Sequence, residues 1–446
     1  MVFFVPFSAT AVVNIGSGDG SSGVQASIFF GALWIMRELP KFRRSSGSPF
    51  RENLRTPTYQ LKLFALVVLL SLIMPLWING GVFIEDPEFA NPNSGPLQFT
   101  SKHITQTLYL FYGLLLSILV AFRNSEVAEF MRSIRIFVIS AIFVSAWGFF
   151  QFFCYLLGFS YPAYIFNTSA TDSALGYVQE LEDIGVKRIS SVATEPSILA
   201  ACMLLALVFA LFALIRQQPL ISKMWDRFAV AIILGALLIS TSTSAYIGLA
   251  AVFVLYLLGL FQLKILRGKY IVVFLSSAAL LGLVYVWSSS AQDVVGSMIV
   301  GKNESYSGIA RLYSVVLAAG YFLQYPILGL GWGSVTSHDL VFKLLSNTGI
   351  LGFLTFFLFL ISLLRRLWRT TKTGKSYNPE RAWRAVCSLT ALLILIFSNI
   401  TADFVFVYGH LWFVLGLAIS ASALYPAEGR REPPPLDLHS KEVMVT

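Results

Sequence analysis

Long apolar segments recur along most of the chain, and they constrain its fold more than any other feature. Segments near residues 59–78, 103–122 and 136–157 each hold about 20 mainly apolar residues, the length that a helix needs to cross a bilayer. The mean hydropathy is +0.73, and 12% of the residues are charged, against about 25% in soluble domains. The chain is therefore predicted to be an integral membrane protein.

About twelve spans are predicted, which makes the fold all-α, a polytopic bundle of transmembrane helices. The first two are short and flank the turn GSGDGSSG, so they form either two crossings or one re-entrant hairpin. The opening MVFFVPF lacks the basic stretch of a signal peptide and is predicted to be part of a retained span. The spans are predicted at residues 2–15, 24–39, 59–78, 103–122, 136–157, 193–215, 228–239, 245–261, 270–287, 338–364, 385–400 and 404–424.

The basic residues lie in alternate loops, which is typical of the cytoplasmic side of a membrane protein. The net charge of +9 comes largely from these loops, so it indicates a lipid bilayer rather than nucleic acid as the partner. Residues 1–424 are predicted to be one transmembrane domain with both termini cytoplasmic. Its outer loops lie at about 158–192 and 288–337, and the proline-rich tail 425–446 is predicted to be disordered.

Three charged residues in and after the first outer loop are candidates for a functional site. Lys187 and Arg188 form a basic pair on the outer side, where the charge bias disfavours one, and Glu195 and Pro196 begin the next predicted helix. Two structural interpretations remain open. An acid at a helix start interacts favourably with the helix dipole, and a loop arginine can simply be solvated.

Residues 305–323 are predicted to form an amphipathic helix on the outer membrane surface, because apolar residues recur there at helical spacing. Arg311 lies in its first turns. A guanidinium is a planar fork that binds two phosphate oxygens and keeps its charge. Arg311 is therefore either a phosphate ligand or an interfacial arginine that extends its charged end to water.

Three spaced glycines, Gly329, Gly331 and Gly333, follow Pro326 in the second outer loop. They do not form a dinucleotide-binding motif, because no strand or βαβ unit surrounds them. We expect them to allow a tight re-entry of the chain and to free backbone amides that can face phosphate.

His338 and Asp339 come directly before a long apolar helix. The pKa of histidine lies near neutrality, so His338 is a candidate proton acceptor from a sugar hydroxyl. Alternatively the pair is a polar helix start in which Asp339 contacts Lys343. His410 and Asp403 in the last predicted span are secondary candidates, since ionisable residues inside a membrane are usually functional.

Other polar features are predicted to be structural. The stretch STSTS at residues 240–244 fits an outer turn between two helices. The cysteines Cys154, Cys202 and Cys387 lie in apolar segments without metal-ligand spacing, so buried inert thiols are expected, and no metal or cofactor is predicted. No internal repeat is found, which disfavours a transporter built from duplicated halves.

The order of these features resembles the O-antigen polymerase and O-antigen ligase superfamily. The pieces that carry the resemblance are RISSVATEPS, STSTSAYIGL, RLYSVVLAAGYFLQYPILGLGWG and SHDLVFKLLSNTGILG, in that order. Together they cover residues 188–352.

The resemblance implies a metal-independent glycosyltransferase in the bacterial inner membrane, with its active site on the periplasmic face. The donor would be an oligosaccharide on undecaprenyl pyrophosphate, and a chain-length regulator and a flippase would be further partners. Arg188 and Arg311, with Lys187, would bind the pyrophosphate. His338 or Glu195 would activate the acceptor hydroxyl.

Two departures separate the alternatives within the family. Many members have an arginine in the serine-rich turn, where this chain has Thr243 and Ala245, and many ligases have asparagine where Asp339 follows His338. The Glu-Pro-Ser sequence resembles polymerases of O-antigen and exopolysaccharide, so a polymerase is predicted and a ligase acting on lipid A–core is the alternative. A transporter of a small anion or lipid-linked sugar is the alternative from another class; charge gathered at the outer rim disfavours it.

Overall fold

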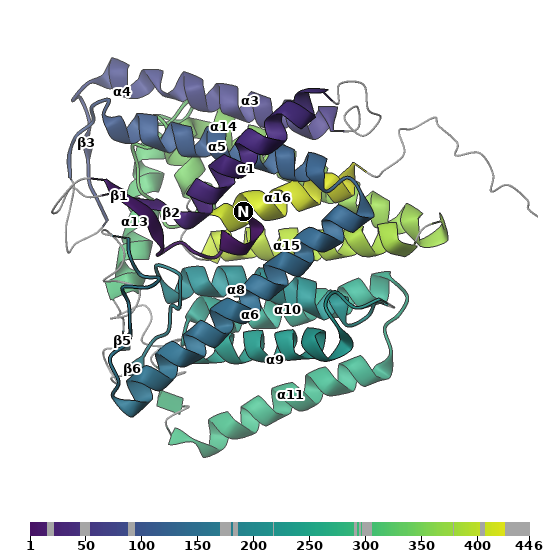
Figure 1. Ribbon diagram of the computed structural model, residues 1–446. Coiled ribbons are helices and arrows are strands. Elements are labelled where there is room, and N and C mark those ends of the chain that lie inside the picture. Colours follow the sequence, from purple (N-terminus) through teal and green to yellow (C-terminus); the bar gives the residue numbers. More distant parts are fainter. Residues whose placement is uncertain are drawn as a thin grey trace, which may run out of the picture.

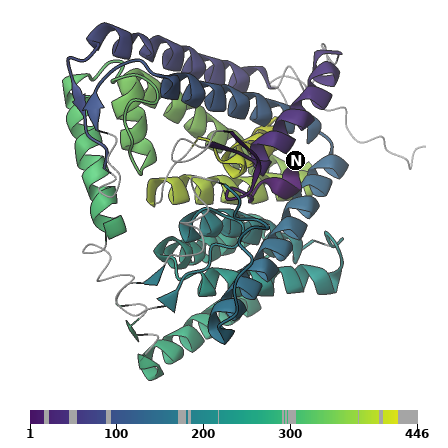
Figure 2. The ribbon, with the colours of Figure 1, turned by 60° about the vertical axis from the view of Figure 1, so that its left-hand side comes forward.

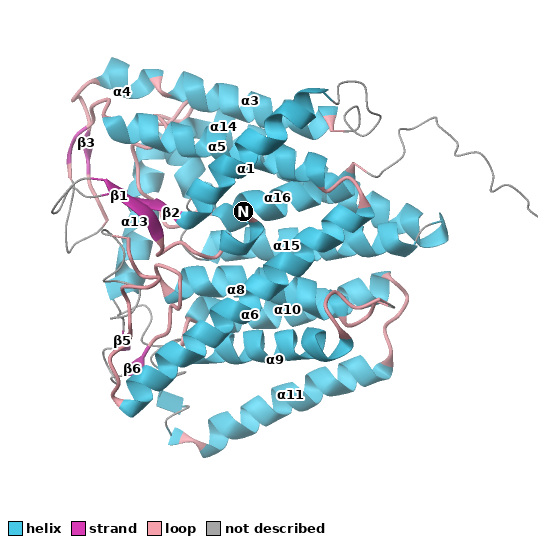
Figure 3. Ribbon diagram, viewed as in Figure 1, coloured by secondary structure: helices cyan, strands magenta, loops and turns pink. Residues whose placement is uncertain are grey.

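The computed structural model is mostly helical and has the architecture of a membrane helical bundle (Figures 1 and 3). It describes residues 1–15, 22–44, 54–87, 94–169, 180–181, 186–216, 218–289, 292–293, 296, 306–377, 379–401 and 406–423. Within these residues, seven helices are long and apolar enough to cross a membrane, judged by length and composition.

In the described part of the chain, the secondary structure consists of helices and three short antiparallel hairpins. The strands pair as β1 (Ala11–Ile15) with β2 (Ser22–Gln25), β3 (Phe83–Ile84) with β4 (Gly95–Pro96), and β5 (Glu180–Leu181) with β6 (Val186–Lys187). The helices are α1 (Ala26–Arg44), α3 (Arg55–Ser71), α4 (Ile73–Ile78), α5 (Ser101–Arg123), α6 (Val127–Leu157), α8 (Pro196–Ala213), α9 (Lys223–Ile239), α10 (Thr243–Gln262), α11 (Gly268–Trp287), α13 (Tyr306–Gln324), α14 (Leu340–Tyr377), α15 (Pro379–Thr401) and α16 (Gly409–Ser422).

Every predicted span from residue 59 onward corresponds to helical structure, and the predicted amphipathic helix corresponds to α13. The span predicted at residues 2–15 is wrong. Val2–Phe4 forms a short 3-10 helix, and Ala11–Ile15 is strand β1. Pro6 lacks an N–H for a helix, and the segment buries Val5 and Phe7 in the core instead of crossing the bundle. The second short prediction falls within β2 and α1.

Helix α8 lies at the centre of the bundle. All of its residues are buried, and it packs against α6, α9, α10 and α15. Its sequence is apolar on every side, as expected for a helix surrounded by other helices. The segment that precedes Pro196 is therefore connected directly to a helix at the centre of the core.

The hairpins and α13 gather at one end of the bundle. Figure 1 shows the three hairpins and α13 together on the left, and Figure 2 shows α13 crossing the ends of the other helices. We call this the hairpin end. The first outer loop, the serine-rich turn and the glycine-rich segment predicted from the sequence all reach it.

Helix α14 is broken at Gly349, whose φ of 63° and ψ of −166° are not helical. This conformation is open almost only to glycine. The glycine-rich segment provides partners for backbone groups of α14 that the break leaves without helical hydrogen bonds. The Leu330 amide donates to the Ser346 carbonyl at 2.8 Å, and the Ile350 amide donates to the Pro326 carbonyl at 2.8 Å. The segment thus fits against the break in α14.

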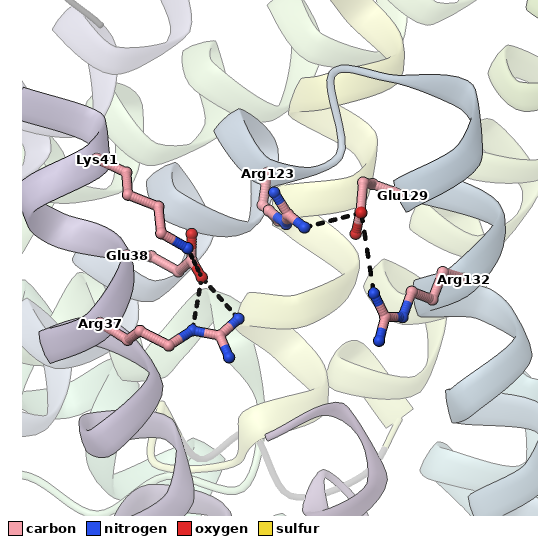
Figure 4. A network of polar contacts seen from close by, with 6 residues as sticks. All are labelled: Arg37, Glu38, Lys41, Arg123, Glu129 and Arg132. Carbon is pink, nitrogen blue, oxygen red and sulfur yellow. Dashed lines mark hydrogen bonds and ion pairs between the residues drawn. The ribbon is translucent and has the colours of Figure 1, made fainter. Parts of the chain in front are cut away.

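Basic residues lie at the opposite end, where α1 and α5 finish and α6 begins (Figure 4). Glu38 accepts from Arg37 and Lys41, and Glu129 pairs with Arg123 at 2.8 Å and approaches Arg132 at 4.0 Å; the six residues in the figure are thus four cations and two carboxylates. Glu38 is buried, whereas the Arg37 and Lys41 side chains that pair with it are largely exposed. The excess of positive charge among the six residues agrees with the loop pattern of a cytoplasmic face.

Candidate functional site

Helix α6 supports the segment between Arg188 and Glu195 through hydrogen bonds. The carbonyl oxygen of the buried Gln151 side chain accepts hydrogen bonds from the Ser190 amide at 3.1 Å and the Ser191 amide at 2.8 Å. Ser191 also donates its hydroxyl to the Val144 carbonyl at 2.7 Å, and its φ of 54° lies in the left-handed region. Such a conformation in serine persists only where the surroundings fix it.

The N-terminal segment holds the same stretch from its other side. The Ala9 amide donates to the Val192 carbonyl at 3.0 Å, and the Thr194 amide donates to the Ser8 hydroxyl at 3.1 Å. All four residues are buried. The residues that the sequence placed in a first span therefore form part of the support for the Arg188–Glu195 segment.

Arg188 interacts electrostatically with residues from three separate parts of the chain: Glu195, Arg311 of α13 and Tyr246 of α10. Burial lowers the pKa of Arg188, as does the positive charge of Arg311, whereas Glu195 and Tyr246 act to raise it. The Nε atom of Arg188 is buried and has no hydrogen-bond acceptor among the described residues. Arg188 is thus within electrostatic range of one like charge and of one carboxylate.

Glu195 occupies the N-cap position of α8, but its side chain makes no capping hydrogen bond to the helix backbone. One carboxylate oxygen instead accepts from the Ser197 hydroxyl at 2.9 Å. The side chain is half-buried between buried neighbours. Helix capping does not account for Glu195, although the positive end of the α8 dipole still favours a negative charge there.

Helix α13 packs against the bundle with one face and exposes the other. Ala310, Ser314 and Tyr321 are buried, and the Tyr321 hydroxyl accepts from the Glu85 amide at 2.9 Å. On the opposite face four apolar residues are exposed, as an amphipathic helix at a membrane surface requires: Ile309, Leu312, Val316 and Leu323. Arg311 lies beside the buried face and is half-buried.

His338 lies beside α13, one helical turn from Arg311. Its backbone amide donates to the Ser314 hydroxyl at 3.2 Å, and that hydroxyl donates to the Arg311 carbonyl at 2.7 Å. Asp339 caps α14, because its carboxylate accepts from the Phe342 amide at 2.9 Å and the Ser337 hydroxyl at 2.9 Å. Asp339 is thus a polar helix start, whereas its side-chain contact with Lys343 stays a prediction.

The glycine-rich segment does not present its amides to a ligand, contrary to the expectation from the sequence. The Gly331 amide donates to the Asn347 carbonyl, and the amides of Gly333 and Val335 both donate to the Asn347 side chain at 3.0 Å. The Trp332 amide donates to the Ser71 hydroxyl. These groups are used to join the segment to the broken helix α14 and to α3.

The remaining candidates are Lys187, His410 and Asp403. Lys187 is exposed on β6. His410 is buried in α16, with its Nδ1 atom 3.3 Å from the Cys202 sulfur and its ring stacked on Tyr408. Asp403 lies outside the described residues. The three cysteines are buried and form no disulfide, as predicted.

The sequence did not single out the residues that support the site. These are Tyr246 on α10, Gln151 on α6 and Ser8 in the N-terminal segment. Each is an ordinary polar residue in an apolar stretch. A buried glutamine facing a loop without regular structure is the one available signal, because such a loop needs partners for its amides.

No protein-family model matches the chain, and no curated protein matches it.

Proposed function

We propose that this protein is a membrane glycosyltransferase that joins undecaprenyl-pyrophosphate-linked oligosaccharide repeat units into a polysaccharide. The observation that carries the proposal is that Arg188 interacts electrostatically both with Arg311, from a segment more than 100 residues away in the chain, and with Glu195. Two guanidinium groups within electrostatic range of one another in a partly buried place are unfavourable unless an anion lies near both. A pyrophosphate has enough oxygens to accept hydrogen bonds from both guanidinium groups.

In the proposed reaction, the hydroxyl oxygen of an acceptor sugar attacks the anomeric carbon of the donor. The bond from that carbon to the pyrophosphate oxygen breaks, and undecaprenyl pyrophosphate leaves with the electron pair. Arg188 and Arg311 stabilise the charge that develops on it, which is work that fixed cations do well away from bulk water. The acceptor proton passes to Glu195 or His338.

Two features favour Glu195 as the proton acceptor. Its carboxylate interacts electrostatically with Arg188, and it is not used as a helix cap. The backbone of His338 is hydrogen-bonded to α13, and its imidazole ring is the alternative proton acceptor. In this proposal the apolar helices cross the bacterial inner membrane. The hairpin end then lies in the periplasm, opposite the basic loops.

Purified protein, a synthetic undecaprenyl-pyrophosphate repeat unit and gel analysis of the products test this function. The reaction is run without added metal, with and without a lipid A–core acceptor. A ladder of products without that acceptor is expected from a polymerase. A single shifted lipid A–core band, seen only with the acceptor, would identify a ligase instead, and an intact donor in both reactions would contradict glycosyl transfer.

A further inference from the structure

We propose that a cavity at the end of the bundle opposite the hairpins binds an anionic phospholipid whose headgroup carries a hydroxyl, such as phosphatidylglycerol. The cavity has a volume of about 520 Å³ and lies between the end of α10 and the last turns of α14. It is separate from the Arg188 cluster, so this inference does not depend on the proposed glycosyl transfer.

The position of the cavity matches the level of lipid headgroups. Helix α10 ends at Gln262, and Trp368 and Lys372 lie in the basic stretch that follows the apolar part of α14; all three residues line the cavity. The ends of two neighbouring spans mark the boundary between acyl chains and water. A ligand there meets an apolar wall on one side and polar groups on the other.

The lining residues suit an amphiphile with a negative charge. Phe261, Leu266 and Trp368 supply apolar surface, whereas Lys264 and Lys372 supply two cations. None of the described residues that line the cavity is acidic. The Lys372 ammonium lies 5.2 Å from the centre of the Trp368 ring, which holds it over the apolar wall. A phosphate ester between the two lysines would satisfy both charges.

Lys264 occupies a backbone position that normally holds glycine. Its φ is 57°, its amide donates to the Phe261 carbonyl, and the Ile265 amide donates to the Leu260 carbonyl. This is the Schellman arrangement that ends a helix, with lysine at the left-handed residue. Glycine would end α10 with less strain, and the residue found there instead is a lysine that lines the cavity.

Gln262 accounts for the hydroxyl in the proposed headgroup. Its side-chain oxygen is buried and accepts no hydrogen bond from the described residues. A phosphate cannot donate to this oxygen when it is ionised, but a hydroxyl of a glycerol headgroup can. The two lysines disfavour an ammonium as the donor to Gln262, so phosphate on the lysines and a hydroxyl on Gln262 together indicate the ligand class.

Native mass spectrometry of the full-length protein, titrated with defined lipids, tests the assignment. The wild type is expected to retain phosphatidylglycerol more tightly than phosphatidic acid, and both more tightly than phosphatidylcholine. Lys264→Gly and Lys372→Gln should each weaken phosphatidylglycerol binding about tenfold, the effect of one charge-assisted hydrogen bond. Lys223→Gln, which neutralises an exposed lysine at the start of α9, should leave it unchanged.

Two further readouts separate loss of binding from loss of folding and from free phosphate. Lys264→Gly should unfold at or above the wild-type temperature, because glycine suits the left-handed position, and Gln262→Leu should bind phosphatidylglycerol only as well as phosphatidic acid. Equal retention of phosphatidylcholine and phosphatidylglycerol, or lysine variants that bind like Lys223→Gln, would overturn the proposal. So would glycerol 3-phosphate binding as tightly as the lipid.

Discussion

The hydroxyl of Ser8 accepts a hydrogen bond from the amide of Thr194 at 3.1 Å, across 186 positions of sequence. Thr194 is the residue directly before Glu195. The N-terminal segment thus fixes the backbone from which the candidate base projects. It does so together with Gln151 of α6, which binds the same segment at Ser190 and Ser191.

Replacing Ser8 by alanine should destabilise the protein and slow transfer. Ser8 is 3% exposed, so Ser8→Ala leaves the Thr194 amide buried without its acceptor, at a cost of about 1–3 kcal/mol. Thermal unfolding in detergent checks the stability, with Ser101→Ala, an exposed serine at the start of α5, as the control. Equal midpoints for the two variants would show that the Ser8 contact does not support the segment.

Asn347 should be intolerant of aspartate. Its side-chain nitrogen donates to the Val335 carbonyl at 2.9 Å and to the Lys343 carbonyl at 2.8 Å, and its oxygen accepts two amides. Asn347→Asp would turn an oxygen toward two carbonyls in a buried place, and we expect a loss on the order of 3 kcal/mol. Thr355→Ala, on the same helix, is the control; an Asn347→Asp midpoint near that of the control would contradict the role of Asn347.

Gly349 and Gly320 offer a matched pair of glycine substitutions. At Gly349, with φ of 63°, an added Cβ would lie 2.2 Å from the backbone of Ile327, so Gly349→Ala should lose on the order of 3 kcal/mol. At Gly320, within α13, an added Cβ meets nothing within 4 Å, and Gly320→Ala should gain up to about 1 kcal/mol. Their unfolding midpoints should move in opposite directions; a shared direction would argue against the break in α14.

The helices could be predicted from the sequence because apolar runs of membrane length favour helices, whether these are buried in lipid or in protein. The prediction failed at residues 2–15, where the hydropathy is also high. That segment is apolar because it packs between α6 and other elements of the bundle, with Phe3 and Phe7 against Phe143. Hydropathy alone does not distinguish burial in protein from burial in lipid.

The candidate site was predictable in part. Arg188, Glu195 and Arg311 could be selected because charged residues beside a bilayer are unfavourable without a reason. The use of the glycine amides could not be predicted, since it depends on the break at Gly349 some 16 to 20 positions later in the chain. The same holds for Tyr246, which reaches Arg188 only through the packing of α10.

The release of undecaprenyl pyrophosphate from a synthetic lipid-linked repeat unit tests the central claim most directly. Arg188→Ala and Arg311→Ala should each slow this release by about 10²–10³-fold, because each removes a cation that stabilises the leaving group. Lys102→Ala, which removes an exposed cation at the start of α5, should stay within about twofold of the wild type. Release by either arginine variant at the rate of Lys102→Ala would contradict the proposed pyrophosphate site.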